Sequence, residues 1–172
     1  MPSYEIFTSP DFQKTEGIVY ASKPLNYNGI YIHDFWLKFH KGKVVDYDDK
    51  TGKDMLKEII FSDEASCYLG ECALVEKTSP IAQMNVTFGT TLIDENASCH
   101  LALGAGFPEC IQNGFQLSEE ELIQKGVNVS KTHVDFMIGT PDLEIKGITA
   151  DKKEVLIFKE GQFEHGFLTH CL

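Results

Sequence analysis

The chain has 172 residues, of which 42% are hydrophobic, and its Asp and Glu residues outnumber Lys and Arg by 26 to 15. This length allows one sizeable hydrophobic core and is short for two ordinary domains, so we expect a single domain. The acidic balance, with no basic cluster interleaved with aromatic residues, argues against a nucleic-acid partner and against an anionic membrane surface. The surplus of carboxylates is compatible with cation binding, although surface acidity that maintains solubility explains it equally well.

No apolar run approaches the roughly 18 residues of a membrane-spanning helix, and the start of the chain has neither the basic end nor the apolar core of a signal peptide. We therefore expect a cytoplasmic protein without a membrane partner. The five cysteines are odd in number and irregular in spacing, which predicts no disulfide framework. A structural zinc site is an alternative use for four of them, but the expected C-x₂-C pairs are missing among Cys67, Cys72, Cys99 and Cys110.

The N-terminal part of the chain predicts a β meander. Lys41-Gly42-Lys43 indicates a tight turn between two of its strands, which is the signature of a hairpin. Apolar residues at helical spacing then predict a short amphipathic helix over residues 52–61, with Thr51 as its cap. Strand-like runs cover residues 4–8, 17–22, 30–33, 35–40 and 44–47.

The middle of the chain combines apolar strands with isolated acids. A strand is predicted over residues 66–75, in which Glu71 stands among apolar neighbours and needs a partner if it is buried. A second strand-like run covers residues 85–93 and ends at Asp94-Glu95-Asn96, just before His100. Residues 101–106 are small and apolar, as in a close-packed segment or loop, and their Gly-x-Gly is too weak a motif to indicate a phosphate loop.

The C-terminal part predicts one helix and further strands. Residues 118–126 have a capping serine, acids in the first turn, and Lys then Gly at the end, so the acids serve the helix dipole and are excluded as metal ligands. Strands are predicted over residues 131–138, 142–149 and 155–158. Many strands and few helices predict an α+β fold with a mixed or antiparallel sheet. We expect this domain to cover residues 1–163, followed by a disordered tail over residues 164–172.

The sequence His133-Val134-Asp135 lies in one of these predicted strands. Because side chains alternate along a strand, the imidazole of His133 and the carboxylate of Asp135 point to the same face. Burying both groups is costly unless charge balances them, and a divalent cation does so by making both groups its ligands. The alternative is a neutral core histidine oriented by a carboxylate.

Counting His133 and Asp135, six acids and imidazoles lie in apolar rather than charged surroundings. A single catalytic zinc ion takes three protein ligands plus water, whereas a pair of ions uses carboxylates both to bridge and to cap. Six ligands therefore suit a dinuclear site, which can activate water at neutral pH and polarise a carbonyl oxygen, as amide hydrolysis requires. Asp94 could take the place of its neighbour Glu95. The six candidate ligands are Glu5, Glu71, Glu95, His100, His133 and Asp135.

Four segments of the chain resemble the C-terminal part of the metallo-aminopeptidases of the aminopeptidase T, aminopeptidase S and aminopeptidase II type. The resemblance covers nearly the whole chain and implies that the same six residues bind two divalent ions, zinc or cobalt. It also implies release of N-terminal amino acids from peptide substrates, and a homodimer in the full-length family. The segments are residues 1–8, Tyr68-Leu69-Gly70-Glu71, residues 94–102 and residues 132–139.

Three departures from the family pattern matter. Ser3 and Tyr4 precede Glu5 where many members have Pro-Thr-Glu-Glu, so a neighbouring carboxylate is absent. The active-site tyrosine of the family falls on Phe107, which has no hydroxyl group. Family members also carry a large N-terminal domain before the matching segment. Two function classes follow: a metal-dependent aminopeptidase, or a non-catalytic metal-binding or assembly fragment.

Overall fold

The computed structural model describes residues 3–164 of the chain. All strand pairs in this part of the chain are antiparallel and its helices are short, which confirms the predicted α+β class. The described residues include no helix that is long and apolar enough to cross a membrane. The tail expected over residues 164–172 lies outside the described residues, except for Glu164.

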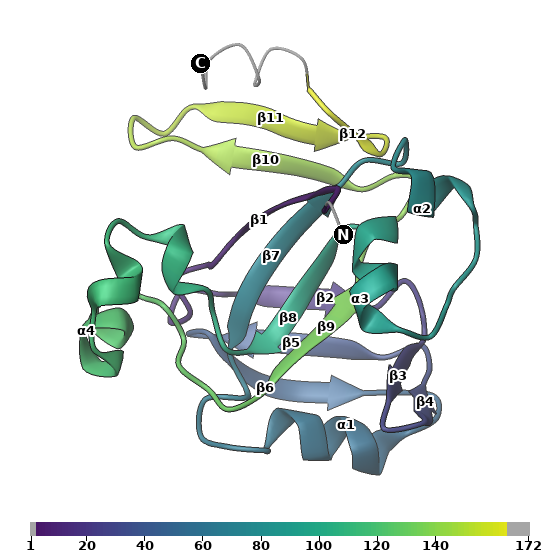
Figure 1. Ribbon diagram of the computed structural model, residues 1–172, viewed down its shortest axis with the longest axis horizontal. Helices are drawn as coiled ribbons and strands as arrows, with labels where there is room; N and C mark the ends of the chain where they lie inside the picture. Colours follow the sequence, from purple (N-terminus) through teal and green to yellow (C-terminus); the bar gives the residue numbers. More distant parts are fainter. Residues whose placement is uncertain (1–2, 165–172) are drawn as a thin grey trace.

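A four-stranded sheet forms the centre of the fold, with the strand order β1-β7-β8-β9 (Figure 1). The strands come from widely separated parts of the sequence, since β1 lies near the N-terminus and β9 lies beyond residue 130. β1 is an edge strand that pairs only with β7. The strands are β1 (Glu5–Thr8), β7 (Leu69–Val75), β8 (His100–Gly104) and β9 (His133–Met137).

Three smaller sheets surround this central sheet. The predicted hairpin forms β5 and β6, and β2 pairs with the other edge of β5. The C-terminal strands form a separate sheet that Figure 1 shows above the central one. The small sheets contain β2 (Gly17–Tyr20), β5 (Trp36–His40) and β6 (Lys43–Asp48); β3 (Leu25–Tyr27) and β4 (Ile30–Ile32); and β10 (Glu144–Ile148), β11 (Glu154–Lys159) and β12 (Gln162–Phe163).

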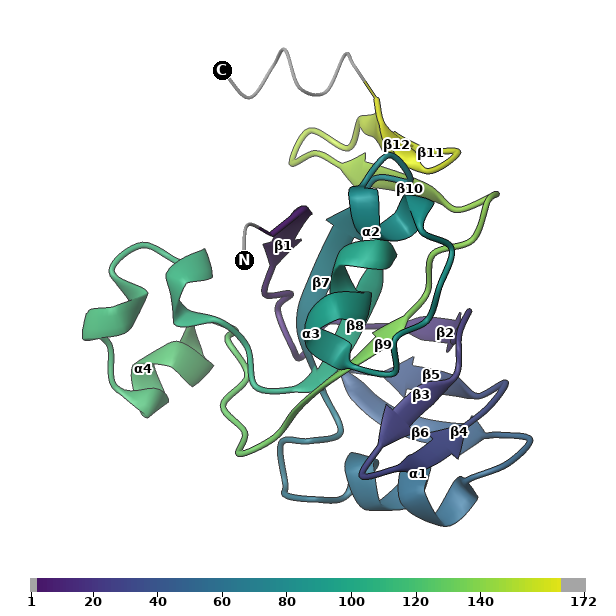
Figure 2. The same ribbon diagram turned by 45° about the vertical axis from the view of Figure 1, so that its right-hand side comes forward.

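Short helices connect these strands. Two of them, α2 and α3, lie over one face of the central sheet (Figure 2). The predicted C-terminal helix forms as α4, and Ser118 and Glu121 make the expected reciprocal capping box. The helices are α1 (Lys53–Ile60), α2 (Pro80–Gln83), α3 (Thr91–Asp94) and α4 (Glu119–Gln124), with 3₁₀ turns η1 (Glu95–Ala97), η2 (Pro108–Cys110) and η3 (Gly114–Gln116).

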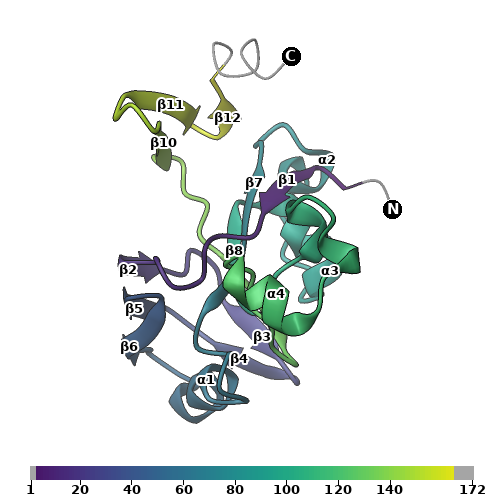
Figure 3. The same ribbon diagram turned by 90° about the vertical axis from the view of Figure 1, so that its left-hand side faces the viewer.

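The main hydrophobic core lies between the other face of the central sheet and the layer formed by the β2-β5-β6 sheet and α1 (Figure 3). Leu103 and Phe136 contribute from the central sheet, and Phe35, Leu37 and Ile60 from the opposite layer. Each of these five side chains is at most 3% exposed. This burial makes the central sheet a firm support, because the core holds one face while the other face remains available for polar groups.

Two local predictions were wrong, and a third left two alternatives open. The segment 85–93 is not a strand: its last residues enter α3, and the carboxylate of Asp94 accepts hydrogen bonds from the backbone N–H groups of residues 88–90. For residues 101–106, the close-packed segment is the correct alternative to a loop, since most of them form the largely buried strand β8. Thr51 does not cap α1, because its carbonyl pairs with His33 and Gly52 takes the cap position with φ of 110°.

Candidate metal centre

The register of the central sheet brings two acids level with each other. Ala102 of β8 pairs with Glu71 of β7 on one side and with Asp135 of β9 on the other. Residues directly opposite in neighbouring strands project to the same face of a sheet. Since Ala102 is small and fully buried, the two longer acidic side chains have room to converge above it.

The next row of the sheet carries the first imidazole. His100 pairs with Ala73 on one side and with Met137 on the other, so it lies on the same face as the two acids. In the rows on either side of these two, Glu5 pairs with Val75 and His133 pairs with Gly104. Five of the six predicted ligands therefore project from one face of the central sheet.

The side-chain atoms of these residues come within a few ångströms of one another. Among the described residues, two groups could each hold a metal ion: Glu5, Glu71 and His100, and Glu71, His133 and Asp135, with ligand atoms within 4.8 Å of one another in each group. Glu71 belongs to both groups. The Nε2 atom of His133 lies 3.1 Å from Glu71 Oε2 and 3.0 Å from Asp135 Oδ1, and that of His100 lies 3.4 Å from Glu5 Oε2 and 4.0 Å from Glu71 Oε2.

Backbone carbonyls orient both imidazoles. Nδ1 of His100 lies 3.0 Å from the carbonyl oxygen of Ser98, and Nδ1 of His133 lies 2.7 Å from that of Ala105. A carbonyl oxygen only accepts, so each Nδ1 carries a hydrogen and each Nε2 faces the carboxylates. This arrangement is typical of metal-binding histidines, whose second nitrogen donates to a fixed partner. The sequence could not predict these two carbonyls, since every residue has one.

The cluster has a surplus of negative charge. Glu71 and Asp135 are buried, and the oxygens Glu5 Oε2 and Asp135 Oδ1 are buried without a hydrogen-bond partner in the described part of the chain. Burial raises the pKa of Glu5, and the nearby carboxylates of Glu71 and Asp135 raise it further, against the lowering effects of Ser3 and His100. Buried carboxylate oxygens without donors fit a divalent cation, which ligates carboxylates and offsets their repulsion.

The pKa of His133 reflects the same surplus of negative charge. Burial opposes its protonation, but the nearby carboxylates of Asp135 and Glu71 outweigh this effect and raise the pKa of His133 to about 10. A proton on His133 therefore compensates part of the negative charge in the metal-free chain. A metal ion would have to replace this proton, because a ligating imidazole nitrogen is deprotonated.

Glu95 lies near this cluster but outside both close groups. Burial, together with the negative charges of Glu5 and Asp135, raises its pKa to about 7. Together with His133 and Asp135, it lines a pocket of about 280 Å³. Its electrostatic coupling to the other acids places Glu95 at the edge of the candidate metal centre.

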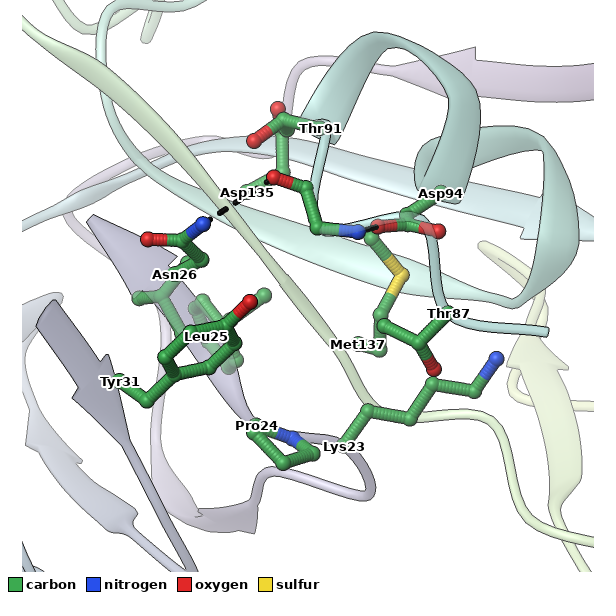
Figure 4. A pocket seen from close by; sticks show the side chains of 12 residues that line it. Lys23, Pro24, Leu25, Asn26, Tyr31, Thr87, Thr91, Asp94, Asp135 and Met137 are labelled. Atoms are coloured by element: carbon green, nitrogen blue, oxygen red, sulfur yellow. Dashed lines mark hydrogen bonds between the residues drawn. The ribbon is translucent and has the colours of Figure 1, made fainter. Parts of the chain in front are cut away.

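Asp94, the alternative to Glu95, has a different role. Its two carboxylate oxygens accept hydrogen bonds from the backbone N–H groups of Phe88, Gly89 and Thr90 at 2.8 to 3.2 Å. Figure 4 shows it in a small pocket that Asp135 also lines. Asp94 therefore stabilises the loop before α3, and Glu95 is the acid whose charge reaches the cluster.

Phe107 lies directly beside the imidazole of His133. Their ring centroids are 5.0 Å apart, and Phe7 lies 5.0 Å from Phe107 on its other side. The backbone N–H of Phe107 donates to Ser9 Oγ at 2.7 Å, which fixes the start of η2. The position at which the resemblance implies a tyrosine is thus at the candidate metal centre, with an apolar ring.

The cysteines do not form the alternative zinc site. Cys67, Cys72, Cys99 and Cys110 are free thiols, and no group of three potential ligands within the described residues includes a cysteine. Burial raises the pKa of Cys72 to about 11, so this thiol is protonated at neutral pH. A protonated thiol is a poor metal ligand.

Comparison with known proteins gives a consistent result. The family described as thermophilic metalloprotease (M29) matches residues 1–163. Aminopeptidase AmpS of Bacillus subtilis is 50% identical over 163 residues, and Aminopeptidase 2 of Geobacillus stearothermophilus is 48% identical over the same length. Each alignment covers 95% of this chain but 40% of the relative, so the chain spans less than half the length of these proteins.

A solved structure has the same fold. Wild-type AmpT from Thermus thermophilus superposes with a TM-score of 0.86 at 33% sequence identity, over 93% of this chain and 39% of the AmpT chain. The family match, the close relatives and this structural similarity agree with the resemblance seen in the sequence. The chain therefore belongs to the M29 family of thermophilic metalloproteases, together with these aminopeptidases.

Proposed function

We propose that this chain is the metal-binding catalytic part of an aminopeptidase that hydrolyses N-terminal peptide bonds with two divalent ions, zinc or cobalt. The observation that carries the proposal is the sharing of Glu71 by the groups Glu5–Glu71–His100 and Glu71–His133–Asp135. Glu95 at the edge of the cluster would complete the ligand set. Four carboxylates and two neutral imidazoles balance the charge of two divalent ions.

When bound, such ions supply a Lewis acid that polarises a peptide carbonyl and lowers the pKa of water. The residues of this chain would hold and orient the ligands. Ser98 and Ala105 fix the two imidazoles through their carbonyls, so that Nε2 of each is directed to the carboxylates. A carboxylate near the ligand set would shuttle a proton during hydrolysis.

The pocket beside the cluster has a size that suits the terminal residue of a peptide substrate. Its volume of about 280 Å³ is below the roughly 300–1,000 Å³ of sites for larger ligands, which suits the terminal residue of a peptide. Leu25, Tyr27 and Leu92 line it together with Glu95, His133 and Asp135. Apolar walls next to the candidate metal ligands would hold the side chain of the N-terminal residue beside its scissile bond.

A non-catalytic metal-binding or assembly fragment is the second candidate function. Phe107 favours it, because its ring lies at the centre without the hydroxyl group that the resemblance implies. The chain also spans 40% of the length of the relatives. A homodimer and a cytoplasmic location stay predictions that rest on the resemblance and on the sequence; size-exclusion chromatography with light scattering would test the former.

A peptidase assay separates the two functions. The chain, stripped of metal and then loaded with Zn²⁺ or Co²⁺, should release the N-terminal residue of a short peptide, and His133→Ala should abolish this release. The same assay should be repeated with the chain fused behind the part of AmpS that precedes the aligned region. Metal binding without peptide cleavage in either form would support the non-catalytic function.

A further inference from the structure

The side-chain amide of Asn96 connects two parts of the candidate metal centre that are far apart in the sequence. Its Oδ1 atom accepts hydrogen bonds from the backbone N–H of Tyr4 at 2.7 Å and from Ser3 Oγ at 3.4 Å. Its Nδ2 atom donates to the carbonyl of Leu92 at 3.4 Å and to Glu95 Oε1 at 3.5 Å. Asn96 is 1% exposed, so water cannot replace these partners.

The contact with Tyr4 matters because of where Glu5 lies. Glu5 is the first residue of the edge strand β1, whose pairing with β7 begins at Glu5 and Val75. The ends of a chain fray unless other contacts hold them. The hydrogen bond from the Tyr4 N–H to Asn96 is made just before this first pair, so it fixes the backbone that carries Glu5.

The other contacts of Asn96 hold the second acid. Asn96 follows Glu95 in η1, and its amide donates both to Glu95 and to the preceding helix α3 through Leu92. The backbone carbonyl of Asn96 accepts a hydrogen bond of 2.5 Å from the buried hydroxyl of Ser79. The side-chain amide of Asn96 therefore contacts both the segment before β1 and the helix α3, while Ser79 holds its backbone.

We propose that Asn96 is a positioning residue of the metal centre, which places Glu5 and Glu95 next to the face of the sheet that carries His100. This inference rests on the proposed function, since it assumes that the cluster binds metal. It distinguishes the two groups of ligands. The group Glu5–Glu71–His100 depends on Asn96, whereas the group Glu71–His133–Asp135 is built on β7 and β9 and does not.

Tyr4→Pro tests this contact without touching the core. Proline lacks the N–H that Asn96 accepts, and Tyr4 is 47% exposed and lies outside the strand pairing. Tyr4→Ala is the matched control, because it removes the side chain but keeps the N–H. Zn²⁺ binding by calorimetry should show one of two sites weakened about 10- to 100-fold in Tyr4→Pro, the usual effect of losing a residue that supports a ligand. Tyr4→Ala should bind like the wild type.

A second pair of variants acts on the amide itself. Asn96→Leu removes every hydrogen bond of the side chain, whereas Asn96→Asp keeps an acceptor for the Tyr4 N–H and should retain more of the affinity at the weakened site. Ser66→Ala is the control for lost stability, because Ser66 is fully buried and hydrogen-bonded to Ile60 and Asp63, outside the metal centre. Circular dichroism of the metal-free variants would show that they are folded.

The outcomes are distinct. Selective weakening of one site in Tyr4→Pro and Asn96→Leu, with both sites intact in Tyr4→Ala and Ser66→Ala, supports the inference. Two wild-type sites in folded Tyr4→Pro and Asn96→Leu, or equal loss at both sites, overturns it while the proposed function stands. Absence of Zn²⁺ binding by the wild-type chain overturns the proposed metal centre and this inference with it.

Discussion

The ring of Phe107 lies against the imidazole of His133, with centroids 5.0 Å apart. A tyrosine at this position would carry its hydroxyl on a ring that already touches a candidate metal ligand. In the metal-loaded chain, Phe107→Tyr should raise the rate of peptide cleavage about 10²- to 10³-fold, by analogy with an oxyanion-hole donor. The rate should be measured as kcat/KM on a short peptide, and an unchanged rate would show that the hydroxyl contributes nothing here.

Glu71 and His100 should differ in their effect on metal binding. Because Glu71 belongs to both groups of candidate ligands, Glu71→Ala should abolish binding of both ions, whereas His100→Ala should remove one. Elemental analysis of each purified variant after loading with zinc would measure this. Equal stoichiometry in the two variants would contradict the assignment of Glu71 to both ions.

Substitutions of Asp94 and of Glu95 should have different effects, although the two residues are neighbours in the sequence. Asp94→Asn weakens the hydrogen bonds to the loop 88–90 and should lower the free energy of unfolding by about 1–3 kcal/mol. Its zinc stoichiometry should stay that of the wild type, whereas Glu95→Gln should reduce zinc affinity. Chemical denaturation and calorimetry measure the two effects, and reduced zinc affinity in Asp94→Asn would instead make Asp94 a ligand.

The metal-free chain should lose stability as the pH rises. The pKa of Glu95 is raised from 4.5 to about 7 by burial and by Glu5 and Asp135, so the folded state binds more protons than the unfolded state in this interval. The contribution of Glu95 to the free energy of unfolding therefore falls as the pH rises from about 4.5 to about 7. The pKa of His133 is raised from 6.5 to about 10, so its contribution is complete below 6.5 and is lost as the pH rises to about 10.

Thermal unfolding in the presence of a chelator, at several pH values between 5 and 10, measures this dependence. Glu95→Gln should flatten the lower part of the profile, since a glutamine does not titrate. A metal-free wild-type chain that becomes more stable between pH 5 and 7 would show that repulsion among the acids does not govern the cluster.

The sequence identified five residues that gather at the candidate metal centre, whereas part of the local structure differs from its predictions. Period-two alternation was enough to place His133 and Asp135 on one face, and the register of the sheet then brings Glu71 and His100 to them. For residues 101–106 the sequence left a close-packed segment and a loop open, because small apolar residues are compatible with both, and the structure has β8 there. The helix α3 was missed because the hydrogen bonds of Asp94 override the strand-like pattern before it.

Other features had no signal in the sequence. Asn96 is one polar residue in a polar cluster, and its connection to Tyr4, 92 residues earlier, exists only in the folded chain. The carbonyls of Ser98 and Ala105 are likewise identified by distance alone. Long-range contacts of this kind depend on sheet register, which one sequence does not specify by itself.

Metal content is the measurement that tests the central claim most directly. The purified chain, loaded with zinc or cobalt and freed of excess ion, should be compared by elemental analysis with the double variant His133→Ala, Glu71→Ala. We expect two divalent ions per wild-type chain and none in the variant. One ion or fewer per wild-type chain, or ions retained by the variant, would contradict a dinuclear centre built on these residues.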